Sequence, residues 1–197
     1  MILPITAYGD PILRKRSTDI VSQYPNLAEI ISNMWETMYN ASGIGLAAPQ
    51  VNLPIRLFLV DSDFILKKLE EEEDQSDNDF AGEKGVTQVF INAKIHSRVG
   101  EEWYYTEGCL SIPNIREDVL RPDEIDIEYY DINFIKHREK FSGLTGRVIQ
   151  HEYDHIEGIL FTDLLKPLKK RLLKNRLERI SKGDVKVDYK MKFPVKK

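Results

Sequence analysis

Apolar residues recur at three- and four-residue spacing in two long stretches, one near each end of the chain. The first stretch follows Pro25 and Asn26, and its apolar positions are Leu27, Ile30, Ile31, Met34, Trp35 and Met38. The second covers residues 164–180, with apolar positions Leu165, Leu168, Leu172, Leu173, Leu177 and Ile180. Because this spacing keeps side chains on one face of an α-helix, the pattern predicts an N-terminal and a C-terminal helix that each pack on a core.

Between these helices the pattern changes to short apolar runs and alternating positions, which are typical of strands. The predicted strands are residues 55–60, 86–95, 101–105 and 122–135. In the last of them Ile125, Ile127 and Tyr129 alternate with acids, as in a half-exposed strand. A turn-rich connection is predicted over residues 107–113.

One segment and the C-terminus interrupt the pattern. Residues 70–74 are all acidic, and polar residues follow, so we expect residues 66–85 to form a solvated, partly mobile insertion. The spacing of an EF-hand is absent there. Residues 184–197 resemble a polar C-terminal tail. Since no repeat or linker divides the remainder, we expect residues 1–183 to form a single catalytic domain.

Composition narrows the class of protein without identifying it. The chain has 197 residues and a net charge of −4, which argues against direct DNA binding. No apolar run approaches the roughly 20 residues that span a bilayer, so we expect no membrane insertion. The N-terminal residues lack the charged and apolar regions of a secretory signal, so we expect a cytoplasmic protein.

The strongest chemical signal is the motif His151-Glu152-Tyr153-Asp154-His155. On a helix the two histidines lie one turn apart on the same face and can reach one cation. Glu152 lies about 100° around the helix, where it can move a proton to or from an attacking water. The alternative is a helix with two surface histidines, but the apolar flanking residues indicate a buried helix. The motif therefore predicts a metal-dependent hydrolase.

A catalytic metal site usually has a third protein ligand. Glu157 and Asp163 are candidates downstream, whereas the third histidine of the extended metalloprotease motif is replaced by Phe161. A lone cysteine such as Cys109 is a buried hydrophobe, a nucleophile or a ligand. Its glycine-rich surroundings and soft thiolate make it the better third ligand. The other two histidines, His96 and His137, lie in polar stretches and are expected to be solvated.

Three short motifs, in order, make the chain resemble the peptide deformylases. They are Gly-Ile-Gly-Leu-Ala-Ala-Pro-Gln at residues 43–50, Glu-Gly-Cys-Leu-Ser at 107–111 and Gln-His-Glu-Tyr-Asp-His at 150–155. The opening residues 3–14 are also similar to the start of this family. The resemblance covers most of the chain, and three motifs together are far more specific than the histidine motif alone.

The resemblance implies hydrolytic removal of the formyl group from the N-terminal formyl-methionine of new polypeptides. It implies Cys109, His151 and His155 as ligands of one divalent metal ion and Glu152 as the general base and acid. Gln50 and the backbone N–H of Leu110 are implied as donors to the oxyanion. The resemblance also implies a bacterial, cytoplasmic enzyme. Members of the family typically use iron(II), and zinc, nickel or cobalt suit the same ligands.

The resemblance also implies the substrate contacts. Gly43, Ile44 and Gly45 would pair with an extended formyl-methionyl peptide, and Glu107 and Gly108 would line the same groove. Three apolar residues are expected either to line a pocket for the methionine side chain or to belong to the hydrophobic core: Ile44, Leu144 and Val148.

The expected architecture is α+β, with antiparallel β-sheets surrounding a central metal-binding helix between the N-terminal and C-terminal helices. Asp154 is expected to pair with Arg121 and so to fix the metal-bearing helix. The basic face of the C-terminal helix is either a site of transient ribosome contact or simply solvated charge. Two other functions stay open: a metallopeptidase that cuts internal peptide bonds, and a descendant that only binds.

Overall fold

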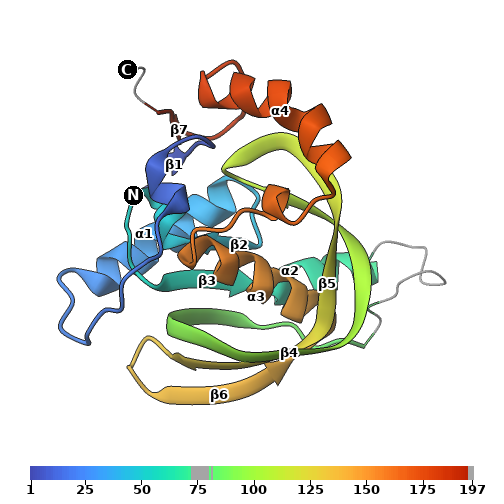
Figure 1. Ribbon diagram of the computed structural model, residues 1–197. Helices are drawn as coiled ribbons and strands as arrows, with labels where there is room; N and C mark the ends of the chain where they lie inside the picture. The colour runs from blue at the N-terminus through green and yellow to red at the C-terminus, as the bar shows by residue number, and fades with distance from the viewer. Residues whose placement is uncertain (72–79, 81, 195–197) are drawn as a thin grey trace.

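The computed structural model describes residues 1–71, 80 and 82–194. A central helix, α3 (Gly143–Ile156), is surrounded by strands, as Figure 1 shows. Five strands form one antiparallel sheet in the order β2-β3-β4-β5-β6. Their bounds are β2 Gly45–Ala47, β3 Leu57–Asp61, β4 Thr87–Cys109, β5 Ile112–Tyr130 and β6 Lys136–Phe141. The predicted α+β architecture, with antiparallel strands around a central helix, is confirmed.

Helix α1 (Leu27–Asn40) matches the N-terminal prediction. Its buried residues Leu27, Ile31, Met34 and Met38 follow the expected stripe and contact β2 and β3 through one hydrophobic cluster. The short 3-10 helix η2 (Ala48–Val51) follows β2 directly and carries Gln50. This apolar stripe thus holds the segment of residues 43–50 against the rest of the fold.

The central hairpin is longer than predicted. The two predicted strands, residues 86–95 and 101–105, fall within the single strand β4, which begins at Thr87 and pairs with β5 along nearly its whole length. The expected connection over residues 107–113 shrinks to Leu110 and Ser111, since the residues on either side join the strands. Register shifts in the pairing bend the hairpin, because each bulge adds local twist. The hairpin can therefore curve around α3 (Figure 1).

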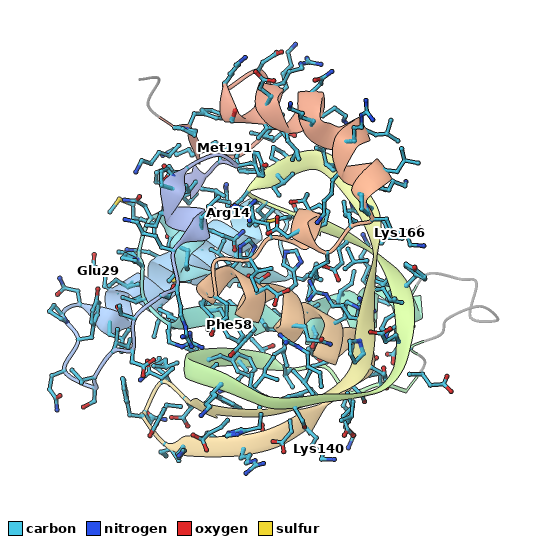
Figure 2. All side chains as sticks on the ribbon, viewed as in Figure 1. Arg14, Glu29, Phe58, Lys140, Lys166 and Met191 are labelled. Carbon is cyan, nitrogen blue, oxygen red and sulfur yellow. The ribbon has the colours of Figure 1, made fainter. Side chains whose placement is uncertain are left out.

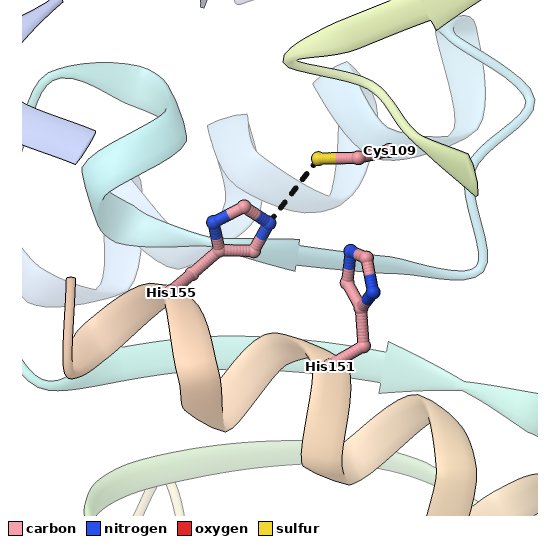
Figure 3. A group of neighbouring side chains, drawn as sticks. All are labelled: Cys109, His151 and His155. Atoms are coloured by element: carbon pink, nitrogen blue, oxygen red, sulfur yellow. Dashed lines mark hydrogen bonds between the residues drawn. The ribbon is translucent and has the colours of Figure 1, made fainter. Parts of the chain in front are cut away.

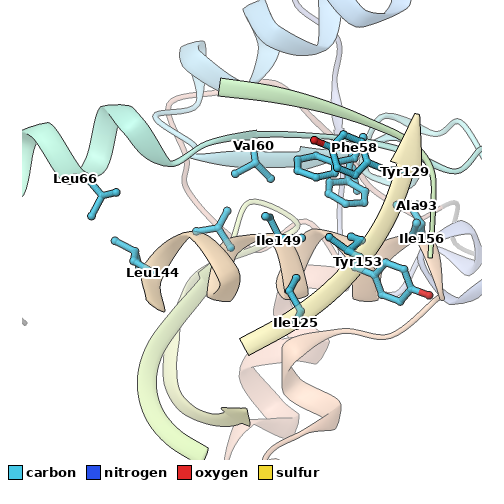
Figure 4. Packing of buried hydrophobic residues seen from close by; sticks show 14 residues of the cluster. Phe58, Val60, Leu66, Ala93, Ile125, Tyr129, Leu144, Ile149, Tyr153 and Ile156 are labelled. Carbon is cyan, nitrogen blue, oxygen red and sulfur yellow. The ribbon is translucent and has the colours of Figure 1, made fainter. Parts of the chain in front are cut away.

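Helix α3 is buried from Leu144 to Ile156. Its apolar side chains pack with Phe58, Phe90 and Ile125 of the sheet (Figure 4). At its N-terminus the carboxylate of Glu83 accepts hydrogen bonds from the backbone N–H groups of Leu144 (3.0 Å) and Thr145 (2.8 Å). A carboxylate at this end satisfies free amides and complements the helix dipole.

The predicted start of the acidic insertion, at residue 66, was wrong. Residues through Glu71 belong to helix α2 (Ser62–Glu71), and Leu66 is buried against Leu144 of α3 in Figure 4. This short helix was missed because most of its residues are polar or acidic and it buries only one side. The remainder of the predicted insertion includes residues 72–79 and 81, which lie outside the described residues.

Helix α4 (Pro167–Ser181) matches the C-terminal prediction, but its buried face is narrower than expected. Leu173, Leu177 and Ile180 are buried, whereas Leu168 and Leu172 are 69% and 66% exposed. Three residues at four- and three-residue spacing suffice to cover this small cluster, so the other two leucines have no surface to cover. The part of the chain that the structure describes contains no helix long and apolar enough to cross a membrane.

The predicted polar tail returns to the body of the protein. Strand β7 (Met191–Lys192) pairs in parallel with β1 (Ile5–Thr6) near the N-terminus. Phe193 and Met191 pack against the hydrophobic cluster under α4. Residues 184–194 are therefore a packed segment in spite of their polar composition. Two further 3-10 turns complete the fold, η1 (Pro11–Arg14) and η4 (Phe161–Asp163).

Candidate metal centre

Cys109, His151 and His155 converge at the centre of the fold (Figure 3). Cys109 is the last residue of β4, and the two histidines lie one turn apart on α3. Their potential ligand atoms all lie within 4.8 Å of one another, and the Cys109 Sγ to His155 Nε2 distance is 3.3 Å. The three residues selected from sequence therefore form one cluster, and both imidazoles are buried.

Glu107 contacts this cluster from behind. Its Oε2 lies 2.8 Å from His151 Nδ1, and since an ionised carboxylate cannot donate, Nδ1 carries the proton and leaves Nε2 for a metal. Burial alone would raise the pKa of Glu107, but hydrogen bonds from His151 and Arg121 lower this pKa well below its usual range. Glu107 is therefore ionised and fixes the orientation of one histidine.

Two buried arginines hold Glu107. Arg121 Nε and Nη2 donate to its two oxygens at 2.7 and 3.0 Å, and Arg147 Nη1 donates at 3.2 Å. Arg121 Nη1 also donates to Asp154 at 2.6 Å, so the expected Asp154–Arg121 pair is present. Buried ion pairs of this kind need several hydrogen bonds to offset desolvation, and here each carboxylate receives them. The network joins the helix, β4 and β5 around His151.

Glu152 is buried beside the cluster, and its Oε2 has no hydrogen-bond partner among the described residues. Burial raises the pKa of this carboxyl to about 7. A buried carboxylate with one oxygen that has no partner among the described residues, next to three potential metal ligands, is the arrangement expected of a group that exchanges protons with a ligand.

Gly45 makes room for Glu152. A Cβ at this position would lie 2.5 Å from Glu152 Oε1, closer than real contacts allow. Gly43 has a similar constraint, because its Cβ would lie 2.8 Å from the Leu110 side chain. The two glycines were expected to let the backbone approach a substrate. The structure adds that they let β2 approach Glu152 and Leu110.

Gln50 points a donor toward the cluster. Its Oε1 accepts from the Ala47 backbone N–H at 2.8 Å, which fixes the direction of the amide. Its Nε2 lies 3.3 Å from Ser111 Oγ and 3.6 Å from Cys109 Sγ. Gln50 is 1% exposed, so this donor is aimed from a buried, fixed position.

The residues predicted for the methionine pocket are placed unequally. Leu144 is completely buried in the cluster around α3 and points toward α2 (Figure 4), so it belongs to the hydrophobic core. Val148 is 6% exposed, and Ile44 is partly buried against the same cluster. Only Ile44 and Val148 retain surface that a substrate could touch.

The remaining ligand candidates are engaged elsewhere. Glu157 pairs with Arg16 and Arg56, and Asp163 pairs with Arg14. His137 pairs with Asp131 on the outer strand β6, and the exposed His96 lies near Glu128. None of the four belongs to the cluster of Cys109, His151 and His155.

Sequence reasoning missed the role of Glu107 and Arg147. Glu107 was predicted to contact substrate, but both of its oxygens are occupied by Arg121, Arg147 and His151. A signal was available, since Arg147 precedes His151 by four residues and so lies on the same helix face. In the structure Glu107 lies between these two residues and contacts both.

The cluster suits a divalent metal ion. One thiolate and two imidazoles form a set of three ligands that leaves a position open for water or substrate. Burial lowers the pKa of His151, but Cys109 and Glu107 raise it well above its usual value, so these surroundings favour positive charge. Burial, aided by His151, lowers the pKa of His155 well below its usual value, so that imidazole is neutral.

Comparisons with known proteins agree on one family. Residues 2–171 match the family model described as polypeptide deformylase. Curated peptide deformylases from Christiangramia forsetii and Flavobacterium psychrophilum are 57% and 55% identical, covering 98% and 100% of this chain and 97% and 100% of their own. The structure of peptide deformylase 1B from Arabidopsis thaliana, in complex with an inhibitor, is 32% identical with a TM-score of 0.76 and covers 92% of each chain.

Proposed function

The chain belongs to the polypeptide deformylase family, whose enzymes hydrolyse the formyl group from the N-terminal formyl-methionine of new polypeptides, and on this premise we propose a role for each residue of the site. Cys109, His151 and His155 hold one divalent metal ion, and Glu152 is the general base and acid. The observation that carries this proposal is the convergence of one thiol and two imidazoles within 4.8 Å, beside a buried carboxylate.

Glu152 moves the proton of the reaction. When bound, the metal ion polarises the formyl carbonyl and lowers the pKa of the attacking water. Glu152 accepts the proton of that water as the C–O bond forms, and delivers it to the amine nitrogen as the C–N bond breaks. Formate and a free N-terminal amine are the products. Burial supports this role, because a carboxyl whose pKa is raised to about 7 can both accept and donate near neutral pH.

Gln50 and Leu110 stabilise the negative oxygen that develops during attack. Gln50 Nε2 is held toward Cys109 by the bond from Ala47 to Oε1, so it needs no reorientation during the reaction. The Leu110 backbone N–H follows the ligand Cys109 directly in the turn. Both donors would bind the same developing oxygen beside Cys109.

The substrate lies along β2 as an added strand. In the described sheet β2 is the terminal strand, paired with β3 on one edge, so its other edge can accept a peptide backbone. Gly43, Ile44 and Gly45 contact the backbone, Gly108 borders it, and Ile44 with Val148 touches the methionine side chain. Glu107 acts through His151 and leaves the substrate untouched.

We assign iron(II) as the native metal. Thiolate and imidazole ligands suit it, although zinc, nickel and cobalt fit the same set. The substrate is made on the ribosome, so we place the enzyme in the cytoplasm. We assign the catalytic domain to residues 1–183, and the C-terminal segment of residues 184–194 packs against it. The measurement is the metal content of anaerobically prepared protein; zinc as the bound metal would contradict the assignment to iron.

Helix α4 offers a surface for transient ribosome contact. Lys169 pairs with Glu117 and Arg179 with Asp184, whereas Leu168, Arg171, Leu172 and Lys174 are exposed. Figure 2 shows side chains projecting from this helix at the opposite end of the view from Lys140. Reversing both charges in R171E/K174E should reduce salt-sensitive co-sedimentation with ribosomes, and K140E should not. Equal co-sedimentation of all three proteins would reject this surface.

The activity itself is tested by formate release. Iron- or nickel-loaded protein should release formate from formyl-Met-Ala-Ser and leave unformylated Met-Ala-Ser intact. A metallopeptidase would cut the unformylated peptide, and a protein that only binds would cut neither.

A further inference from the structure

The segment after α4 returns to the turn that carries the active-site residues. Tyr189 Oη donates a hydrogen bond to the backbone carbonyl of Leu110 at 2.8 Å. Leu110 directly follows Cys109, and Tyr189 lies outside the residues that match the family model, 2–171. A residue beyond the matched region therefore touches the turn between β4 and β5.

The segment that follows Tyr189 is anchored to the fold. Two residues later the chain forms β7, where the backbone N–H groups of Ile5 and Ala7 donate to Lys190 and Lys192 at 2.8 Å each. Met191 and Phe193 pack against the same hydrophobic cluster as Ile112, the first residue of β5. The segment is thus anchored to the fold independently of the tyrosine hydroxyl, which can act as a fixed donor.

The turn itself depends on contacts from outside the hairpin. The β4–β5 pairing shifts register between Gly108 and Cys109, so the ladder is irregular at this end. The Tyr8 backbone N–H donates to the Ser111 carbonyl at 2.8 Å, and Gln50 Nε2 donates to Ser111 Oγ at 3.3 Å. Both bonds hold Ser111, whereas the Tyr189 bond holds Leu110.

We propose that Tyr189 is a positioning residue for deformylation: its hydroxyl fixes the Leu110 residue, and with it the direction of the Leu110 N–H and of the Cys109 thiolate. This inference rests on the proposed role of Leu110 in the oxyanion site. The pKa of Tyr189 is raised, chiefly by burial and further by Cys109, so the hydroxyl keeps its proton and remains a donor. The C-terminal segment thereby completes the active site.

The test removes one hydroxyl from the full-length protein. Tyr189→Phe should lower kcat for formyl-Met-Ala-Ser about five-fold, the size expected for one hydrogen bond, with KM nearly unchanged. Tyr129→Phe is the matched control, because it removes a hydroxyl bond of 2.7 Å to Glu139 between β5 and β6. The control should keep the wild-type kcat, and the two variants should melt at similar temperatures.

A second readout does not depend on the metal. Cys109 is the single cysteine, so the rate of its reaction with a disulfide reagent in metal-free protein reports how accessible this turn is. Tyr189→Phe should raise this rate several-fold, and Tyr129→Phe should leave it unchanged.

Each outcome decides the inference. Wild-type kcat and thiol rate in Tyr189→Phe would overturn it, and a rise in KM at constant kcat would assign Tyr189 to substrate binding instead. If wild-type protein released no formate, the proposed site roles would fail, and the thiol rates would still show whether Tyr189 holds the turn.

Discussion

Helices α3 and α4 are nearly equal in length, 14 and 15 residues, but the fold uses them in opposite ways. In α3 every residue from Leu144 to Ile156 is buried, including Arg147, His151 and Glu152. In α4 only Leu173, Leu177 and Ile180 are buried, and two leucines are exposed. The more hydrophilic-looking motif thus lies at the centre, and the clearer apolar stripe lies at the surface.

The difference lies in what satisfies the polar groups. Burying a charge is costly unless it is paired, and in α3 the pairs are provided by Glu107 and Arg121 of neighbouring strands. In α4 the charged residues are exposed, and their ion pairs lie at the surface, as Glu178 pairs with Lys182. Buried polar residues therefore mark the helix that carries chemistry, and the following substitutions test this contrast.

The largest effect is expected for Glu152. Glu152→Ala removes the proton carrier and should lower kcat about 1000-fold, within the range of general acid–base catalysis, while metal content is unchanged. Formate release under steady-state conditions is the measurement. Glu178→Ala in α4 is the matched control and should keep full activity, because Glu178 is exposed and pairs with Lys182 at the surface. An active Glu152→Ala variant would end the proposed mechanism.

The second-largest loss of kcat is expected for Gly45→Ala. Its Cβ would lie 2.5 Å from Glu152 Oε1, so either β2 or the carboxylate must move. A displacement of this kind can cost about 100-fold in kcat. Metal content should stay at the wild-type value, which separates displacement of Glu152 from loss of the metal site. Unchanged kcat would show that β2 yields without cost.

Arg121→Ala should weaken metal retention. It leaves Glu107 and Asp154 buried without their main partner, so metal affinity should fall about 10- to 100-fold and stability by about 3–5 kcal/mol. Chelator competition and denaturant unfolding measure the two effects. Arg179→Ala in α4 removes an exposed pair with Asp184 and should leave the free energy of unfolding nearly unchanged. Similar losses for both arginines would remove the contrast between the helices.

The smallest effect on activity is expected within α4. Leu173→Ala opens a cavity in the cluster under the helix and should cost about 2–5 kcal/mol of unfolding free energy. Leu172→Ala changes an exposed position and should stay within about 0.5 kcal/mol of wild type. Both should retain kcat at temperatures where they are folded. A large cost at Leu172 would mean that this face is covered in solution.

The sequence predicted the parts that local patterns determine. The spacing of His151 and His155 is a property of a single helix, and α1 follows its apolar stripe. Cys109, the oxyanion donors and the substrate contacts came through the resemblance to a family. In the structure Cys109 joins the two histidines, and Gln50 points toward it.

The rest depends on contacts between distant segments, which no local pattern contains. Glu107 meets His151 across 44 positions, and Tyr189 meets Leu110 across 79. Strand β4 was predicted as two separate strands because bulges break the alternation that marks a continuous strand. Leu168 and Leu172 were predicted to face the core because the apolar spacing identifies the face of a helix. It does not show how wide a part of that face other residues cover.

The central claim is that Cys109, His151 and His155 hold the metal while Glu152 performs the proton transfer. The most direct test measures metal content and formate release together on anaerobically prepared wild-type protein and Glu152→Ala. The account predicts a single metal ion per chain in both proteins and formate release only from the wild type. Equal formate release by both proteins, or undiminished release by wild-type protein after its metal is removed, would contradict it.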